Sequence, residues 1–210
     1  EHNVYFGFHV LDEIKRLFLL KLWNVYSFFV TYANLNNWST NNKMPDPTNI
    51  LDRWILSRMS GNIKNITGSE GDKSKGLVNY IVHDAMGQVE IFIYDLSNRY
   101  VRRIRDRVSS ENEDLDDKKR ALETLHFVLK EYMKAMAPFV PFITEEIYRN
   151  LTNEVSVHLC DWPRVKILYD KYYKEELEKG MEDVWAISEQ GHARRKEANI
   201  RLRQPLASLT

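Results

Sequence analysis

The sequence predicts an all-α fold, a helical bundle followed by a small extended and helical appendage at the C-terminal end. Apolar residues recur at every third or fourth position over long segments, the spacing that gathers side chains on one face of a helix. Only 8 glycines and 6 prolines occur among 210 residues, which favours long helices over strands and turns. Because 43% of the residues are hydrophobic, the chain can bury a sizeable core.

Six helical segments are expected along the chain. They span about 9–35, 48–67, 77–108, 117–137, 144–151 and 169–196. Proline and glycine mark several of the breaks between them. Pro45 and Pro47 exclude a helix before the second segment, and Gly68 is expected to end it. Pro138 and Pro141 separate the fourth segment from the fifth.

The apolar stripes of the long segments define the expected core. The first four segments contribute Ile14, Phe18, Leu22, Val25, Phe29 and Tyr32; then Leu51, Ile55, Met59, Ile63 and Ile66; then Ala85, Val89, Ile93, Leu96, Tyr100 and Ile104; and finally Leu122, Leu125, Leu129, Tyr132 and Met136. The other aromatic residues of the first helix are also expected in the core, namely Trp23, Tyr26 and Phe28. Thr48 is the expected N-cap of the second helix.

The composition changes after residue 153, which sets the predicted domain boundary. Residues 1–153 are expected to form the bundle, and residues 154–210 a linker, a long helix and the start of a truncated C-terminal region. Alternating apolar and polar residues predict short extended segments at 155–159 and 199–206.

The charge balance limits how this chain can bind a polyanion. Thirty basic and thirty acidic residues give a formal net charge of zero, so attraction to nucleic acid requires a local basic surface. The apolar stretch 17–33 is interrupted by polar residues and predicts a buried helix rather than a membrane span. The single cysteine, Cys160, excludes an internal disulfide and favours the cytoplasm.

A cluster of arginines near the end of the third helix is the main candidate site. Arg99, Arg103 and Arg107 lie four residues apart and share one helix face, flanked by Arg102 and Arg105. Guanidinium groups bind phosphate well, so the cluster predicts contact with an RNA backbone. The alternative is a solvated helix end that offsets the helix dipole and pairs with the acidic residues 111–117.

Further candidate RNA-binding residues lie elsewhere in the chain. Trp38, in a polar loop, could stack on a base. A second basic run consists of Arg194, Arg195, Lys196, Arg201 and Arg203, and its four arginines are candidate RNA contacts. No catalytic residues and no metal ligands are assigned. A rival from another class is a di-metal oxidase, and a further alternative is a helical module that binds only protein. The oxidase would use the pairs Glu123/His126 and Glu189/His192 together with Glu13 and Glu90.

Several stretches of the chain resemble class I isoleucyl-tRNA synthetases in sequence, in order and in spacing. These stretches are 23–34 (WNVYSFFVTYAN), 51–58 (LDRWILSR), 95–107 (DLSNRYVRRIRDR), 136–151 (MAPFVPFITEEIYRNL), 156–163 (SVHLCDWP) and 201–206 (RLRQPL). The valine and leucine enzymes share similar stretches and remain alternatives, although residues 96–105 look like the isoleucine branch.

This resemblance implies the helical anticodon-binding domain of a cytoplasmic enzyme that joins isoleucine to its tRNA. The expected partners are an isoleucine-accepting tRNA and the rest of the synthetase. The resemblance implies that ATP and Mg²⁺ serve the parent enzyme. The sequence signatures that hold ATP in this family are not found in this chain, so we expect no catalysis and no cofactor in this part.

Overall fold

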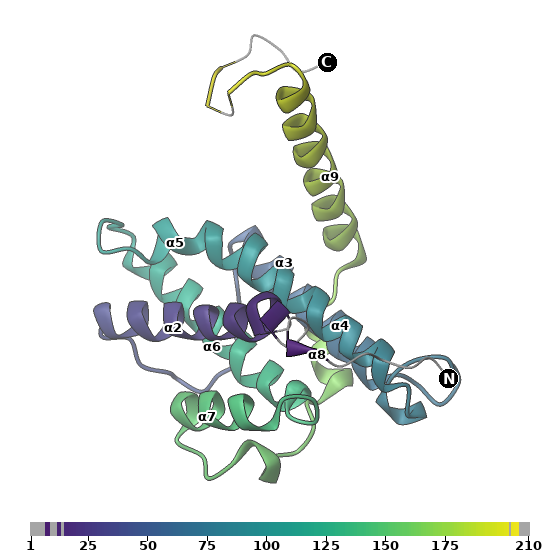
Figure 1. Ribbon diagram of the computed structural model, residues 1–210. Helices are drawn as coiled ribbons and strands as arrows, with labels where there is room; N and C mark the ends of the chain where they lie inside the picture. Colours follow the sequence, from purple (N-terminus) through teal and green to yellow (C-terminus); the bar gives the residue numbers. More distant parts are fainter. Residues whose placement is uncertain (1–6, 9–11, 14, 202, 206–210) are drawn as a thin grey trace. The chain divides into compact units, whose positions relative to one another are not determined.

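Helices account for most of the chain in the computed structural model, which describes residues 7–8, 12–13, 15–201 and 203–205 (Figure 1). The chain divides into two compact units, Glu1–Tyr173 and Lys174–Thr210. Within the described residues no segment joins a β-sheet, and the only bridge noted is an isolated pair, Ser69 and Asp72. The predicted all-α class is therefore confirmed.

The first unit contains all of the elements that surround the candidate site. In chain order they are the π-helix η1 (Lys15–Leu19), α2 (Leu20–Leu35), α3 (Ile50–Thr67), the 3-10 helix η2 (Leu77–Asn79), α4 (Val82–Tyr94), the π-helix η3 (Asp95–Val101), α5 (Arg102–Val108), α6 (Leu115–Met136), α7 (Pro141–Thr152), the 3-10 helix η4 (Val157–Leu159) and α8 (Val165–Tyr172).

Helix α3 is the central element of this unit, since it packs against α4, α6 and α8. Its apolar residues Ile55, Met59 and Ile63 are fully buried, as their spacing predicts. Gly61 allows α3 to approach the end of α8, because a Cβ atom there would lie 3.0 Å from Cε2 of Tyr173. Ile66 is also buried, whereas Leu51 is only partly buried, so the expected core of the second segment is confirmed except at Leu51.

The two ends of α3 show how local chemistry sets its bounds. Asn49, not Thr48 as predicted, is the N-cap, because its Oδ1 accepts a hydrogen bond from the Leu51 N–H at 2.9 Å. At the other end Gly68 has φ 79°, and a Cβ there would lie 2.6 Å from the Lys75 carbonyl oxygen. Only glycine fits this turn, so the predicted stop at Gly68 is confirmed.

The segment predicted as one helix over 77–108 is divided in the structure. Tyr80 adopts a left-handed conformation with φ 61°, which separates η2 from α4. Farther along, the helix widens into the π-helix η3 before it continues as α5. Helical periodicity continues across both irregularities, so it gave no sign of them.

The region after α7 also differs from its prediction. Within the segment expected to be extended, 155–159, Val157–Leu159 form the 3-10 helix η4, and Ser156 just before it has extended backbone. Glu145 of α7 accepts hydrogen bonds from Ser156 Oγ and from the Val157 N–H at the start of this helix. The helix predicted over 169–196 is two helices, since α8 ends at Tyr172 and α9 begins at Glu175. The first unit therefore extends past residue 153.

The second unit consists of α9 (Glu175–Glu197) and the tail that follows it. Its described tail residues, 198–201 and 203–205, form turns and irregular backbone rather than the predicted strand. Asn199 has φ 53°, and the Arg195 guanidinium donates hydrogen bonds to the carbonyl oxygens of Arg201 and Gln204. These bonds fold the tail back; the rest of the predicted strand, 202 and 206, lies outside the described residues.

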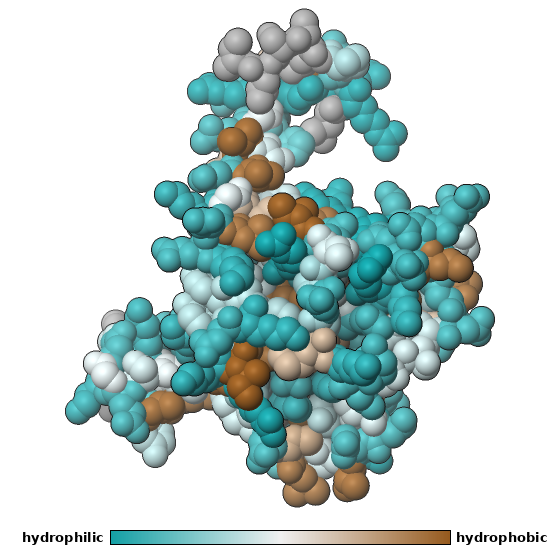
Figure 2. Space-filling view, turned by 180° about the vertical axis from the view of Figure 1, so that it is seen from behind, coloured by the Kyte–Doolittle hydropathy of each residue, from teal (hydrophilic) through white to brown (hydrophobic). Residues whose placement is uncertain are grey.

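The surface of the molecule is mainly hydrophilic on the face shown in Figure 2, where apolar side chains form small, separate patches. Among the described residues, no helix has both the length and the apolar character needed to cross a membrane.

Candidate nucleic-acid interface

A groove between α2 and the η3–α5 segment brings part of the predicted arginine cluster together with an aromatic ring. Its cavity has a volume of about 490 Å³. The residues that line it are Asn24, Val25, Phe28, Ser97, Val101, Arg102 and Arg105. It therefore combines positive charge, polar hydrogen-bonding groups and a ring on which a base can stack.

Arg102 and Arg105 are the two cations of this groove that remain available to a ligand. Both are exposed, and neither forms an ion pair or hydrogen bond through its side chain with any described residue. The guanidinium carbon of Arg105 lies 5.8 Å from the centroid of the Phe28 ring, a cation–π distance. The groove thus presents two unneutralised charges beside an aromatic face.

Arg99 and Arg103 belong to the same η3–α5 segment, but their side chains bond to residues of that segment itself. Arg99 forms an ion pair with Asp95 at 3.1 Å, and Arg103 donates hydrogen bonds to the backbone carbonyls of Asn98 and Arg99. Partial burial lowers the pKa of Arg103, and the neighbouring charges of Arg102 and Arg99 lower it further. The two residues contribute to the positive potential of this surface, and their predicted RNA contact remains a prediction.

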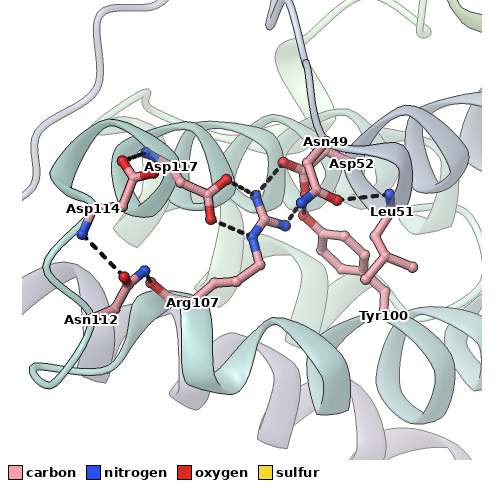
Figure 3. A network of polar contacts seen from close by, with 8 residues as sticks. All are labelled: Asn49, Leu51, Asp52, Tyr100, Arg107, Asn112, Asp114 and Asp117. Carbon is pink, nitrogen blue, oxygen red and sulfur yellow. Dashed lines mark hydrogen bonds and ion pairs between the residues drawn. The ribbon is translucent and has the colours of Figure 1, made fainter.

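Arg107 does not lie on this surface as the spacing predicted. Its side chain is only 13% exposed, and its guanidinium is bonded on two sides by Asp52 and Asp117 (Figure 3). It donates to both carboxylates bidentately, at 2.7 to 2.9 Å. Four of its five N–H groups are thus occupied, so Arg107 joins α3, α5 and α6 and is not positioned to bind phosphate.

Tyr100 completes this network from the preceding turns of the helix. Its hydroxyl donates a 2.6 Å hydrogen bond to Asp52, and complete burial raises the pKa of Tyr100 well above its usual range. Hydrogen bonds from Arg107 lower the pKa of Asp117 below 3.8. Arg107 thus links the helix that carries Arg102 and Arg105 to Asp52 of α3 and Asp117 of α6.

Trp38 lies next to a different cavity from the one that contains the arginines. It is half-buried, with its ring centroid 5.5 Å from that of Phe29 and 5.1 Å from that of His126. These contacts cover part of the ring that was predicted to stack on a base. Its role in RNA binding therefore stays a prediction.

The second basic run belongs to the other compact unit. Arg194 pairs with Glu197 at 3.2 Å, and Arg195 binds the carbonyls of the tail. Arg201 and Arg203 are exposed. Their predicted contact with RNA remains a prediction.

The di-metal alternative is not supported by the arrangement of Glu123 and His126. His126 Nε2 is hydrogen-bonded to the Leu151 carbonyl at 3.0 Å, and Glu123 accepts a hydrogen bond from Asn41 at 2.9 Å. Across the part of the chain that the structure describes, no three His, Cys, Asp or Glu side chains are grouped as metal ligands. Glu123 and His126 instead form hydrogen bonds that hold neighbouring segments of the chain in place.

Two residues of the groove were not identified as site residues from the sequence. Phe28 was assigned to the core, but the structure leaves it half-exposed, and Asn24 was not singled out. Trp23, also expected in the core, is 42% exposed. Asn24 lies four positions before Phe28 on the same helix face. This polar residue was the sign in the sequence that the face is not fully buried.

Comparison with known protein families shows which family the chain that forms this groove belongs to. A model of the family described as the anticodon-binding domain of tRNA ligase matches residues 52–210. The chain belongs to this family. The match includes the η3–α5 segment with Arg102 and Arg105, so this part of the groove lies on an anticodon-binding domain.

The similar proteins found by sequence are isoleucine–tRNA ligases. The chain is 39% identical over 207 residues to the enzyme of Clostridium tetani and 41% identical over 206 residues to that of Clostridium novyi. It is 37% identical over 201 residues to the enzyme of Protochlamydia amoebophila. These matches cover 94–95% of this chain but only 18–19% of each relative, so the chain spans about a fifth of their length.

Proposed function

We propose that this chain is the anticodon-binding part of an isoleucine–tRNA ligase and that the groove between α2 and η3–α5 binds its tRNA. The parent enzyme would act in the cytoplasm, attaching isoleucine to tRNA with ATP and Mg²⁺ in a catalytic region outside this chain. The isoleucine–tRNA ligases similar to nearly the whole chain support this choice over the valine and leucine enzymes.

The observation that carries the proposal is the pair Arg102 and Arg105 beside Phe28. Cations without carboxylate partners attract phosphate, and phosphate contacts set the position of an RNA on a protein. Anticodon bases are unpaired in their loop, so they can turn outward, stack on an aromatic ring and expose their hydrogen-bonding edges. Asn24 and Ser97 are polar groups of the same groove that can bond to such an edge.

Replacing both Arg102 and Arg105 by alanine is expected to weaken binding of isoleucine tRNA by about tenfold or more. Hydrogen bonds to charged groups contribute about 1.5–3 kcal/mol each. Each lost phosphate contact should also reduce the slope of log affinity against log salt by about 0.7 to 0.9. The measurement is a fluorescence-anisotropy titration of labelled tRNA at several salt concentrations.

A matched control removes the same charge elsewhere. Arg53 and Arg164 are exposed and line neither this groove nor the cavity beside Trp38, so their double alanine variant should retain both affinity and salt slope. If the two double variants lose affinity equally, binding follows net charge only, and the groove is not the site.

A further inference from the structure

A second cavity lies between the loop that follows α2 and the first turns of α6. Its volume is about 460 Å³. It is lined by Asn36, Asn37, Trp38, Ser39, Thr40, Asn41, Leu115, Lys118, Lys119 and Leu122. This lining includes two lysines and no carboxylate, together with several amide and hydroxyl groups and two leucines.

Lys118 is the cation of this cavity that is best placed to meet a ligand. The stem of its side chain is covered, since the residue is only 6% exposed, while its ammonium group keeps access to solvent and forms no ion pair or hydrogen bond with the described residues. A lysine whose stem is packed and whose charged end stays in water holds its ammonium group within a narrow range of positions. An anion in this cavity would therefore meet a positioned positive charge, with no carboxylate in the lining to compete for it.

The walls of the cavity are held in place before any ligand binds. The Asn36 amide donates to the Tyr32 and Val108 carbonyls, and the Asn41 amide donates to Glu123. These bonds tie the loop to the ends of α2 and α5 and to α6. A cavity with fixed walls loses little conformational freedom when it binds a ligand.

Other polar groups in the same loop are not used by the protein. The side chains of Asn37 and Ser39 are exposed and make no hydrogen bond with the described residues. An amide offers both donors and an acceptor, which suits the mixed hydrogen-bonding edge of a nucleobase. The cavity thus combines a cation for a phosphate with free polar groups for a base.

The cavity lies farther along the same helix as the arginine groove. Asn24 and Phe28 line the groove, and Asn36 lines the cavity. Phe28 follows Asn24 by four residues and Asn36 follows Phe28 by eight, along α2 and its C-terminal end. Phe28 and Asn36 are separated by about 12 Å, at 1.5 Å per helical residue. A single RNA strand lying along this side of α2 can therefore contact both.

We propose that the cavity bounded by Trp38 and Lys118 is a subsite for one unstacked nucleotide of single-stranded RNA, with its phosphate at Lys118 and its base at the Asn37–Ser39 edge. This inference rests on the proposed function, since it extends the tRNA contact from the groove to a second point. The subsite would receive a nucleotide of the same anticodon loop.

Replacing Lys118 by methionine tests the subsite, with Lys166→Met on α8 as the matched control. Methionine retains an apolar stem and removes the charge. With a synthetic anticodon stem-loop of isoleucine tRNA, affinity should fall about fivefold for Lys118→Met, and the salt slope should fall by about 0.7, the value for one single-strand phosphate contact. Lys166 is exposed and lines neither cavity, so its variant should match the parent chain.

Nuclear magnetic resonance can detect ligand binding in the cavity directly. The indole N–H resonance of Trp38, assigned by its loss in Trp38→Phe, should shift when the stem-loop is added. It should not shift with inorganic phosphate at the same ionic strength. Lys118→Met should unfold at about the same urea concentration as the parent chain, since it keeps the packed apolar stem and removes a charge that is in contact with solvent.

The outcomes separate this inference from the proposed function. If Arg102→Ala/Arg105→Ala weakens stem-loop binding and Lys118→Met does not, the subsite is wrong and the groove stands. A Trp38 shift with inorganic phosphate equal to that with RNA would reveal a general anion site and overturn the nucleotide assignment. If the parent chain binds no stem-loop at all, both proposals fail.

Discussion

Replacing Arg107 by methionine is expected to destabilise the bundle by about 3–5 kcal/mol, because it leaves Asp52 as a buried carboxylate without a counter-charge. Asp52 is 0% exposed, and Arg107 is bonded to both of its oxygens (Figure 3). Tyr100 supplies one further hydrogen bond, which cannot replace a full positive charge. Urea unfolding followed by circular dichroism measures the change.

Two further variants locate the origin of this loss. Asp52→Asn/Arg107→Met removes both charges, so it should recover a large part of the stability lost by Arg107→Met alone. Arg105→Met, on the same helix but exposed, should change stability by less than about 0.5 kcal/mol. An Arg107→Met variant as stable as Arg105→Met would contradict the role given to this network.

The same network predicts a dependence of stability on pH. Arg107 lowers the pKa of Asp117 in the folded protein, so the unfolded chain binds a proton more readily. The stability contributed by this pair is present above the usual pKa of 3.8 and is lost as pH falls through the lower folded value. The Arg107→Met variant should therefore lose less stability on acidification than the parent chain.

Ending the chain after Asn153 is expected to destabilise the first unit by several kcal/mol, whereas ending it after Tyr173 should leave it folded. Helix α8 covers α3, and burying a Leu-sized side chain contributes about 1.5–3 kcal/mol. Leu168 and Tyr172 are both buried, and the Tyr172 hydroxyl donates to the Pro45 carbonyl at 2.9 Å. Such a loss is a large fraction of the roughly 5–15 kcal/mol that stabilises a typical domain.

The two truncated chains also test where the folding unit ends. Residues 154–173 hold Trp162, whose indole N–H donates to Thr67 at 2.9 Å, in addition to α8. Equal urea midpoints for the chains ending at 153 and 173 would favour the sequence-based boundary of 1–153. A lower midpoint or loss of cooperativity in the shorter chain alone would support our proposal that the bundle ends at Tyr173.

The helices were predictable because their apolar spacing records which face is buried. Ile55, Met59 and Ile63 are fully buried as their periodicity indicated. The breaks at Tyr80 and at Tyr173 were not predictable, because neither contains the glycine or proline that usually marks an interruption. The break at Tyr80, which is 89% exposed, is a local turn in which the Ile81 N–H donates to the Gly76 carbonyl. The Tyr173 ring instead packs against Gly61 of α3, a contact that periodicity along the sequence does not reveal.

The candidate site was predictable only in part, and Arg107 shows why. Its spacing from Arg103 places it on the predicted basic face, but its partner Asp52 is 55 residues earlier in the chain. Spacing along one helix cannot reveal a carboxylate supplied by another. For the same reason the sequence did not single out Lys118, whose significance depends on its burial beside a loop from a distant segment.

The most direct test of the central claim is whether this chain distinguishes anticodons. The measurement compares its affinity for isoleucine tRNA with that for the same tRNA in which only the three anticodon bases are replaced. We predict weaker binding of the replaced tRNA, because base contacts specify sequence while phosphate contacts only position the RNA. Equal affinity for the two tRNAs would contradict anticodon recognition by this chain.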